Sequence, residues 1–141
     1  MPEGEIDLES AETSTPRWRL LLFGGSGAVG QAIGDTACAL GWAVTAVSRS
    51  RRSSTTERTW VQYDPAGDGF SQPDFAPGGP FDAVCWAQGA NRGDSVLDFD
   101  AVASAALYEA NCLYIARSLN ELLAADLLSP AGARLCVVSS I

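Results

Sequence analysis

The sequence contains neither histidine nor lysine, and these two absences restrict its chemistry. Histidine is the commonest metal ligand and the side chain that titrates near neutral pH, so neither a histidine metal site nor a histidine base is available. The four cysteines lie far apart and form no C-x-x-C pair, which argues against a zinc site. We expect them to be small core residues of a protein from a reducing compartment, the cytoplasm. They are Cys38, Cys85, Cys112 and Cys136.

The chain also lacks a long apolar run and a face of clustered positive charge. No stretch is long enough to span a membrane. A nucleic-acid partner is not expected, because binding a phosphate backbone requires clustered basic residues and the formal net charge is -8. Residues 1–16 are rich in acid and carry no apolar segment, so they are unlike a secretory leader and we expect a disordered acidic tail. Residues 17–141 have the size of one domain.

A glycine-rich turn joins an apolar strand to a helix near the start of this domain. The strand is predicted at Trp18–Phe23 and the helix at Ala28–Leu40, ending at Gly41. Gly25, Gly27 and Gly30 follow the G-x-G-x-x-G spacing, in which the first permits a tight turn, the second lets backbone approach phosphate and the third lets the helix pack on the strand. Amides at the helix start then face the anion. The alternative is a tight turn without a ligand. The residues predicted to cradle a dinucleotide diphosphate are Gly24, Gly25, Ser26, Gly27, Ala28, Val29 and Gly30.

The second predicted strand, Trp42–Val47, is followed by serine and arginine instead of an acid. An NAD-binding protein usually places an acidic residue about twenty positions after the glycines, where it binds the ribose 2′-hydroxyl. Arginine instead offers a planar fork of donors that matches phosphate. Ser48 and Arg49 therefore predict a seat for the 2′-phosphate of NADP, with NAD the less favoured coenzyme. A solvated basic loop is the alternative.

Three further strands are predicted at Arg58–Tyr63, Phe81–Ala87 and Arg134–Val138. The first ends at Asp64, which either accepts a hydrogen bond from an adenine amino group or simply starts a turn before proline. Between residues 65 and 80 glycine and proline leave room for little more than a helical turn near Phe70. The strand after it ends in a segment that allows close backbone approach to a ligand, formed by Ala87, Gln88 and Gly89.

A long helix is predicted at about 99–123, because this run contains no glycine or proline. Strands that alternate with helices predict an α/β fold of the Rossmann-like, doubly wound type. We expect an open parallel sheet in the strand order 3-2-1-4-5. Its cofactor would lie at the carboxyl ends of the strands.

From residue 17 to residue 141 the order of these signals resembles the first half of a short-chain dehydrogenase/reductase. The spacing Gly24-x-x-Gly27-x-x-Gly30 is similar to that of the family's extended or atypical members. The family's Asn-Asn-Ala-Gly motif falls on residues 86–89, where only the glycine is kept. The resemblance implies that Asn111 supports a water in a proton relay and that Ser140 is the catalytic serine. It also implies an alcohol or carbonyl substrate.

The family's proton donor, a tyrosine with a lysine four residues later, has no counterpart in this sequence. We therefore expect the chain to be the amino-terminal part of a longer NADP-dependent oxidoreductase, incomplete as a sheet and inactive by itself. The alternative is a non-catalytic NADP sensor or partner subunit. The resemblance also implies a homo-oligomer through the helix at 99–123, although core packing alone would explain much of that helix's apolar character.

Overall fold

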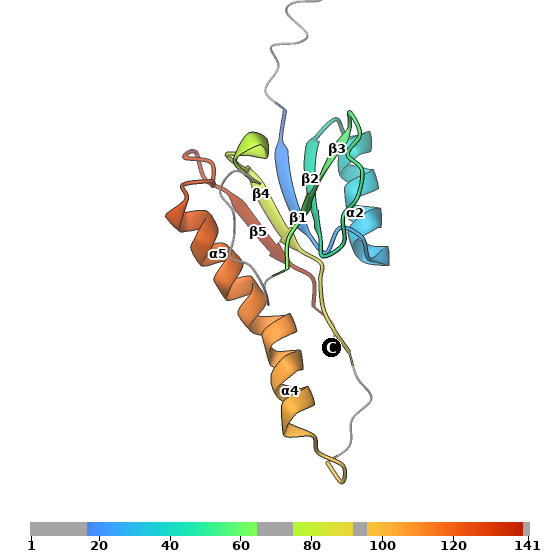
Figure 1. Ribbon diagram of the computed structural model, residues 1–141. Coiled ribbons are helices and arrows are strands. Elements are labelled where there is room, and N and C mark those ends of the chain that lie inside the picture. The colour runs from blue at the N-terminus through green and yellow to red at the C-terminus, as the bar shows by residue number, and fades with distance from the viewer. Residues whose placement is uncertain (1–16, 65–74, 92–95, 140–141) are drawn as a thin grey trace, which may run out of the picture.

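The computed structural model describes residues 17–64, 75–91 and 96–139, and its centre is a five-stranded parallel sheet. The strand order is β3-β2-β1-β4-β5, which confirms the predicted topology (Figure 1). Each strand forms within two residues of its predicted ends. The acidic tail, the turn expected near Phe70 and Ser140 lie outside the described residues. The strands are β1 Arg19–Phe23, β2 Ala43–Ser48, β3 Arg58–Gln62, β4 Ala83–Trp86 and β5 Arg134–Val137.

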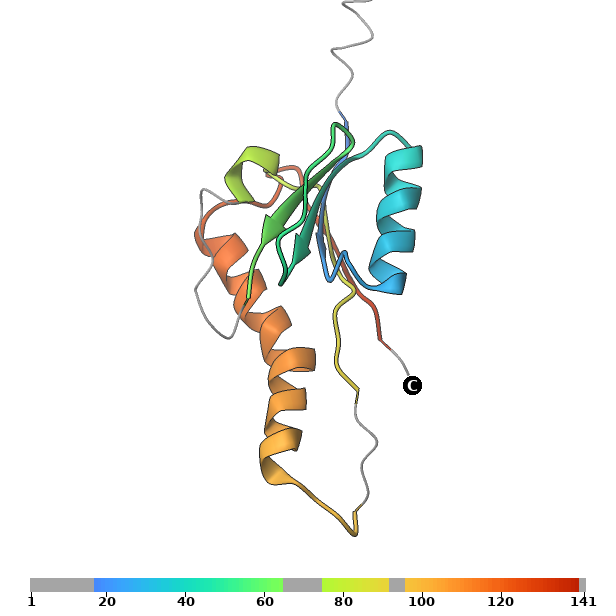
Figure 2. The ribbon, with the colours of Figure 1, turned by 45° about the vertical axis from the view of Figure 1, so that its right-hand side comes forward.

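Helices lie on both faces of the sheet, as Figure 2 shows. One face carries α2, Ala28–Ala39. The other carries α5, Tyr114–Ala124, and a short 3₁₀ turn at Ala76–Gly78 precedes β4. The first part of the long helix, α4, Ala101–Tyr108, projects beyond the edge of the sheet (Figure 1). Among the described residues, none of the helices combines the length and apolar character needed to cross a membrane. The three layers make the doubly wound α/β arrangement that was predicted.

Side chains of β1 alternate between two hydrophobic clusters, one on each face of the sheet. Leu20 and Leu22 join the cluster beneath α2, and Leu21 and Phe23 join the cluster beneath α5. Phe23 stacks on a tryptophan of β4 with 5.6 Å between ring centroids and meets Tyr114 edge-on, also at 5.6 Å. Such aromatic contacts hold their rings in defined orientations. The start of α5 is therefore fixed rigidly against the end of β1.

The long helix is interrupted by a π-helical turn at Glu109–Leu113, so the prediction of one regular helix over 99–123 is wrong in this detail. A π turn inserts one extra residue into the helical ladder, and its position cannot be read from the presence of good helix formers alone. It lies beside the segment that follows β4, where Asn111 bonds to the backbone of Ala90. The interruption thus coincides with a contact between the helix and the cofactor edge of the sheet.

Two of the four cysteines are exposed, which corrects the expectation that all of them are core residues. Cys85 is buried and Cys38 is half-buried, whereas Cys112 and Cys136 are exposed. Cys136 belongs to β5, whose four residues are all exposed although the strand pairs with β4. The prediction was wrong because the sequence does not show how many strands lie beside β5. In the described sheet β5 pairs with a strand on one side only.

Candidate functional site: a cleft at the carboxyl edge of the sheet

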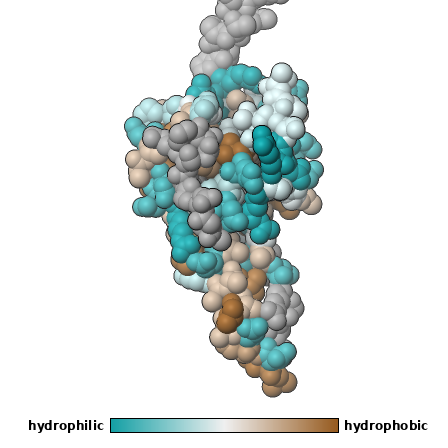
Figure 3. Space-filling model, viewed as in Figure 1, coloured by the Kyte–Doolittle hydropathy of each residue, from teal (hydrophilic) through white to brown (hydrophobic). Residues whose placement is uncertain are grey.

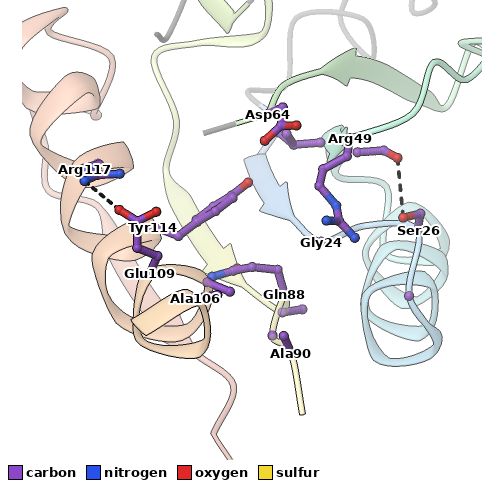
Figure 4. Close-up of a pocket in the computed structure, with 16 residues that line it drawn as sticks. Gly24, Ser26, Arg49, Asp64, Gln88, Ala90, Ala106, Glu109, Tyr114 and Arg117 are labelled. Atoms are coloured by element: carbon purple, nitrogen blue, oxygen red, sulfur yellow. Dashed lines mark hydrogen bonds and ion pairs between the residues drawn. The ribbon is translucent and has the colours of Figure 1, made fainter. Parts of the chain in front are cut away.

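The carboxyl ends of the first four strands open into one cleft of about 440 Å³. Parallel strands bring their ends to a common edge, and ligands of open α/β sheets bind there. Figure 4 shows several of these side chains around the cleft. Nine residues predicted from the sequence to bind the cofactor line it: Gly24, Ser26, Gly27, Ser48, Arg49, Asp64, Ala87, Gln88 and Gly89.

The tight turn after β1 depends on Gly24, not on Gly25 as predicted. Gly24 has a φ of +70°, and a Cβ built on it would lie 2.5 Å from the backbone nitrogen of Gln88. Both the left-handed backbone and this close approach exclude a side chain. Gly30 is required for another reason, since its Cβ would lie 2.0 Å from the Gly24 carbonyl oxygen. The spacing Gly24-x-x-Gly27-x-x-Gly30 is therefore the one that the geometry supports.

Gly27 differs from both, because no contact within the described part of the chain requires glycine there. Its φ of -74° and ψ of 169° suit any residue, and the atom nearest to an added Cβ would be the Gly24 carbonyl oxygen at 3.7 Å. Gly27 lines the cleft, so an added side chain would occupy space that a ligand could use. A backbone that must approach phosphate closely accounts for glycine at such a position.

The N-terminus of α2 leaves its first amides without a side-chain cap. Gly27 is its N-cap residue, no side chain bonds to the cap, and the first turn contains no acidic residue. At α4, by contrast, the Asp100 carboxylate accepts hydrogen bonds from the backbone nitrogens of Val102 and Ala103, at 3.0 and 3.1 Å. The first amides of a helix are strong donors near the positive end of its dipole. At α2 these donors lie beside the cleft, as in anion-binding sites.

Four other residues of the predicted glycine loop do not line the cleft. Ala28 and Val29 line a separate apolar groove between α2 and the strands β1, β4 and β5, and a Cβ at Gly25 would meet the Ala46 side chain at 2.9 Å. Gly30 packs against the loop as described above. These residues can therefore contribute backbone amides or packing to the cleft, but not side-chain contacts.

Two serine hydroxyls and one guanidinium group line the part of the cleft between the ends of β1 and β2. The buried Ser48 hydroxyl lies 3.5 Å from that of Ser26 and 3.2 Å from that of Ser50. Arg49 turns its guanidinium into the cleft (Figure 4), while its carbonyl oxygen accepts a hydrogen bond from Gln62 at 3.1 Å. Hydroxyls and a guanidinium together are donors that match a phosphate. The structure thus brings Ser48 and Arg49 to one place, as the sequence predicted.

The opposite wall of the cleft comes from the interrupted helix, and the sequence reasoning missed it. Each of its residues has another three or four positions away, which places them on one helix face. The sequence signal for this wall was a pair of small residues, Ala106 and Ala110, followed four positions later by an aromatic residue, Tyr114. Small side chains there leave room for a ligand. A Glu109–Arg117 ion pair of 2.9 Å lies on this wall, and because both side chains are about half exposed it adds little stability. The lining residues are Ala106, Glu109, Ala110, Tyr114 and Arg117.

Tyr114 projects its hydroxyl into the cleft on the side of Asp64 (Figure 4). Burial raises the pKa of Tyr114 well above its ordinary value, and the neighbouring Tyr63 and Asp64 raise it further, while Arg49 acts in the opposite direction. The hydroxyl therefore stays neutral at physiological pH. It can donate or accept a hydrogen bond, but a proton donor for catalysis works best with a pKa near the working pH.

Asn111 clamps the π turn to the segment that follows β4. Its Oδ1 accepts a hydrogen bond from the Ala90 nitrogen at 2.9 Å, and its Nδ2 donates to the Ala90 carbonyl at 3.0 Å. Both ends of the amide are thus used on the backbone, so the side chain fixes the wall of the cleft relative to its floor. Asn111 is not among the residues that line the cleft. Its predicted partner in catalysis, Ser140, lies outside the described residues.

Gln88 places an unsatisfied amide beside the cleft. Its Oε1 and Nε2 atoms are buried and have no hydrogen-bond partner among the described residues. Leaving such a group unpaired costs about 1–3 kcal/mol, so its presence fits a site whose polar partner is a ligand. Within 17–64, 75–91 and 96–139, no three acidic, cysteine or histidine residues gather as metal ligands would. The Gln88 amide thus presents a donor and an acceptor beside the cleft.

Solved structures with the same fold include several short-chain dehydrogenase/reductases. An oxidoreductase of this family from Burkholderia thailandensis has a TM-score of 0.73 and 21% identity, covering 90% of this chain and 53% of that chain. A family protein from Francisella tularensis has a TM-score of 0.71 and 17% identity, covering 89% and 52%. A third, from Burkholderia multivorans with bound NADP, has a TM-score of 0.69 and 21% identity, covering 89% and 59%.

These likenesses show that the chain has the Rossmann-like fold of those proteins. The chain spans about half to three fifths of their length. No family model and no curated protein sequence matches it. At identities of 17–21% the fold is what is shared, so the role of the cleft must be argued from its own residues.

Proposed function

We propose that this chain is the NADP-binding part of an oxidoreductase of the short-chain dehydrogenase/reductase family. The observation that carries the proposal is Gly27, a glycine with ordinary backbone angles and open space beside it, at the uncapped start of a helix. A diphosphate bound by the first amides of α2 explains both features. The bound NADP in the structure from Burkholderia multivorans supports this choice of ligand class.

Each part of the cleft is assigned to one part of the coenzyme. The amides of residues 24–30 would hold the diphosphate, and Ser48 with Arg49 would hold the 2′-phosphate that distinguishes NADP from NAD. Asp64 would accept a hydrogen bond from the adenine amino group. Ala87, Gln88 and Gly89 would contact the coenzyme where β4 ends. When bound, NADPH would supply a hydride to a carbonyl compound, and NADP⁺ would accept a hydride from an alcohol.

Fewer residues are assigned to the substrate than to the coenzyme. We propose that the chain by itself binds the coenzyme but does not catalyse a reaction. Ser140 would bond to the substrate oxygen. Asn111, whose side-chain amide is bonded to Ala90, would support a relay water through its backbone. Reduction also requires a proton donor, and the tyrosine in this cleft, Tyr114, has a raised pKa and no lysine to lower it. The same observation favours a second function, an NADP-binding sensor or partner subunit in which occupancy changes association.

Titration calorimetry with NADPH tests the binding proposal directly. We expect saturable binding of one NADPH per chain and no oxidation of NADPH when small aldehydes and ketones are added to the purified chain. The absence of heat with both NADPH and NADH would overturn the assignment of the cleft. Turnover with any carbonyl substrate would contradict the proposed lack of activity but would leave the coenzyme site in place.

Replacing Arg49 with alanine should remove the preference for NADPH over NADH. A guanidinium that bonds to a charged group contributes about 1.5–3 kcal/mol, so the affinity for NADPH should fall about tenfold to a hundredfold while that for NADH stays unchanged. Calorimetry with both coenzymes measures this. Arg134→Ala is the matched control, because it removes an equal charge from β5, away from the residues that line the cleft. Equal losses for both coenzymes in Arg49→Ala would count against a 2′-phosphate seat.

We also propose that α4 forms the contact between two copies of this chain. Figure 3 shows hydrophobic residues gathered over the part of the molecule that carries α4. The helix has no buried residue, and Val102 is 81% exposed. Apolar helices without a covered face tend to be covered by a partner. Val102→Glu should therefore convert a dimer into a monomer in sedimentation experiments, whereas Leu40→Glu, at an exposed apolar residue beyond α2, should not. A wild-type chain that sediments as a monomer at micromolar concentration would refute this contact.

A further inference from the structure

The loop at 49–57 joins β2 to β3, which is the edge strand on the side of the sheet opposite β5. Every residue of this loop is exposed, and none of them belongs to a helix or a strand. The loop contains three of the nine basic residues of an acidic chain, namely Arg49, Arg51 and Arg52. It is therefore an exposed segment of concentrated positive charge.

Two hydroxyl side chains of this loop bond to the outer edge of β3. The Ser54 hydroxyl oxygen accepts a hydrogen bond from the backbone nitrogen of Trp60 at 2.9 Å. The Thr55 hydroxyl oxygen accepts one from the backbone nitrogen of Arg58 at 3.2 Å. Edge strands otherwise present such N–H groups to solvent. Ser54 thus has a defined place in the fold, although both of these bonds are exposed and water can replace them.

Ser54 lines a cavity of about 660 Å³ together with two arginines. Arg51, Arg52 and Trp60 also line it, and the Arg52 guanidinium carbon lies 5.0 Å from the centre of the Trp60 ring. Within the described parts of the chain, neither Arg51 nor Arg52 forms an ion pair. Guanidinium groups present a fork of N–H donors that suits the oxygens of a phosphate. The donors around Ser54 therefore suit a phosphoryl group carried by this residue.

The sequence places the two arginines three and two residues before Ser54. They form the only pair of adjacent basic residues in the chain. Protein kinases choose their substrates partly by the charge pattern around the acceptor residue. One class of serine kinases binds arginines at these two positions through carboxylates of its own cleft. The loop can enter such a cleft, because it lies outside the helices and strands and its bonds to β3 are exposed.

We propose that Ser54 is a phosphorylation site for an arginine-directed serine kinase and that Arg51 and Arg52 bind the resulting phosphate. The Ser54 Oγ atom attacks the γ-phosphorus of ATP, the bond between this phosphorus and ADP breaks, and the hydroxyl proton passes to a carboxylate of the kinase. A phosphoserine carries a charge of about -1.5 to -2 at pH 7 and forms charge-assisted hydrogen bonds with nearby arginines. This inference does not depend on the proposed coenzyme function.

Phosphorylation of the full chain in vitro tests the acceptor residue. The protein is incubated with ATP, Mg²⁺ and the catalytic subunit of cyclic-AMP-dependent protein kinase, and is then cleaved after arginine. Cleavage isolates the peptide 53–58, and mass spectrometric fragmentation separates Ser54 from the other hydroxyl residues of that peptide. We expect one phosphate per chain, on Ser54. No incorporation, or a phosphate on another residue while Ser54 stays unmodified, would overturn the proposal.

Phosphorus-31 NMR of the phosphorylated chain tests the role of the arginines. The second pKa of the phosphate should be lower in the native protein than in the same protein unfolded in urea. The reason is that two guanidinium groups held beside the phosphate favour its dianionic form. The same pKa in both states would show that Arg51 and Arg52 do not bind the phosphate, and would overturn that part of the proposal.

Three variants complete the test. Ser54→Ala should abolish the incorporation of phosphate, whereas Ser53→Ala, the matched control from the same cavity, should be phosphorylated like the wild type. Arg51→Ala should slow the reaction about tenfold to a hundredfold, because one charge-assisted contact with the kinase is lost. Equal incorporation in Ser54→Ala and the wild type would contradict the proposal, and the site mapped in the wild type decides the question even if a variant fails to fold.

Discussion

A Gly27→Asp variant should lose about a hundredfold or more of its affinity for NADPH, equivalent to about 2.7 kcal/mol, without losing stability. The position has the extended backbone of an N-cap, and an aspartate there can accept hydrogen bonds from the first amides of α2. Its carboxylate would thus occupy the donors assigned to the diphosphate and repel that group electrostatically. The helix gains a cap while the cleft loses its anion site.

The Gly27→Asp variant should lose affinity for NADPH without losing stability, and this combination distinguishes a blocked binding site from a misfolded protein. Capping and the helix dipole together should leave the free energy of unfolding unchanged or raise it by about 0.5 kcal/mol. Urea unfolding and NADPH calorimetry measure the two effects on one preparation. Gly27→Asn is the matched control, because it caps the helix without the negative charge and should bind more NADPH than the aspartate variant. If Gly27→Asp binds NADPH as tightly as the wild type, the diphosphate does not lie at this helix.

A Gly30→Ala variant should be destabilised by about 3 kcal/mol, a large fraction of the stability of a small domain. The added methyl group would lie 2.0 Å from the Gly24 carbonyl oxygen and 2.9 Å from the Gly25 Cα. These are backbone atoms of the turn, which cannot move without displacing α2 from β1. The loss of coenzyme binding that follows would be a consequence of the displaced loop.

Urea unfolding followed by circular dichroism measures this change, with Gly27→Ala as its control. The two substitutions add the same methyl group three residues apart, but at Gly27 the nearest atom is 3.7 Å away. We expect Gly27→Ala to change the free energy of unfolding by less than about 1 kcal/mol. Equal stability losses in the two variants would show that the close approach at Gly30 does not exist in solution.

The strand order and the position of each strand could be predicted because apolar runs and turn residues are local features of the sequence. Strands buried on both faces, such as β1 and β4, are nearly continuous apolar segments. The π turn at Glu109–Leu113 could not be predicted, since it depends on a contact between Asn111 and a residue far away in the chain. The exposure of Cys136 likewise depends on how many neighbours β5 has.

Some residues of the candidate site could likewise be predicted from the sequence, and others could not. Residues at strand ends, including Arg49 and Asp64, were found because topology alone brings such ends together. The wall formed by the helix was missed, because whether Tyr114 faces the cleft or another surface depends on the rotation of the helix. The choice between Gly24 and Gly25 for the turn required the backbone angles. In each case the missing information is three-dimensional geometry that the local pattern of residues does not contain.

The extra residue of the π turn sets the angular phase of everything that follows it in the helix. Tyr114 reaches the cleft, while Ser118 and Leu122 are fully buried on the same side of α5, with the Ser118 hydroxyl bonded to the Trp86 indole at 2.8 Å. Ala106 and Ala110 precede or lie within the turn and face the cleft as well. Shortening this helix by one residue would rotate its second half by about 100° relative to its first half. Evolution can therefore exchange residues here far more freely than it can insert or delete them.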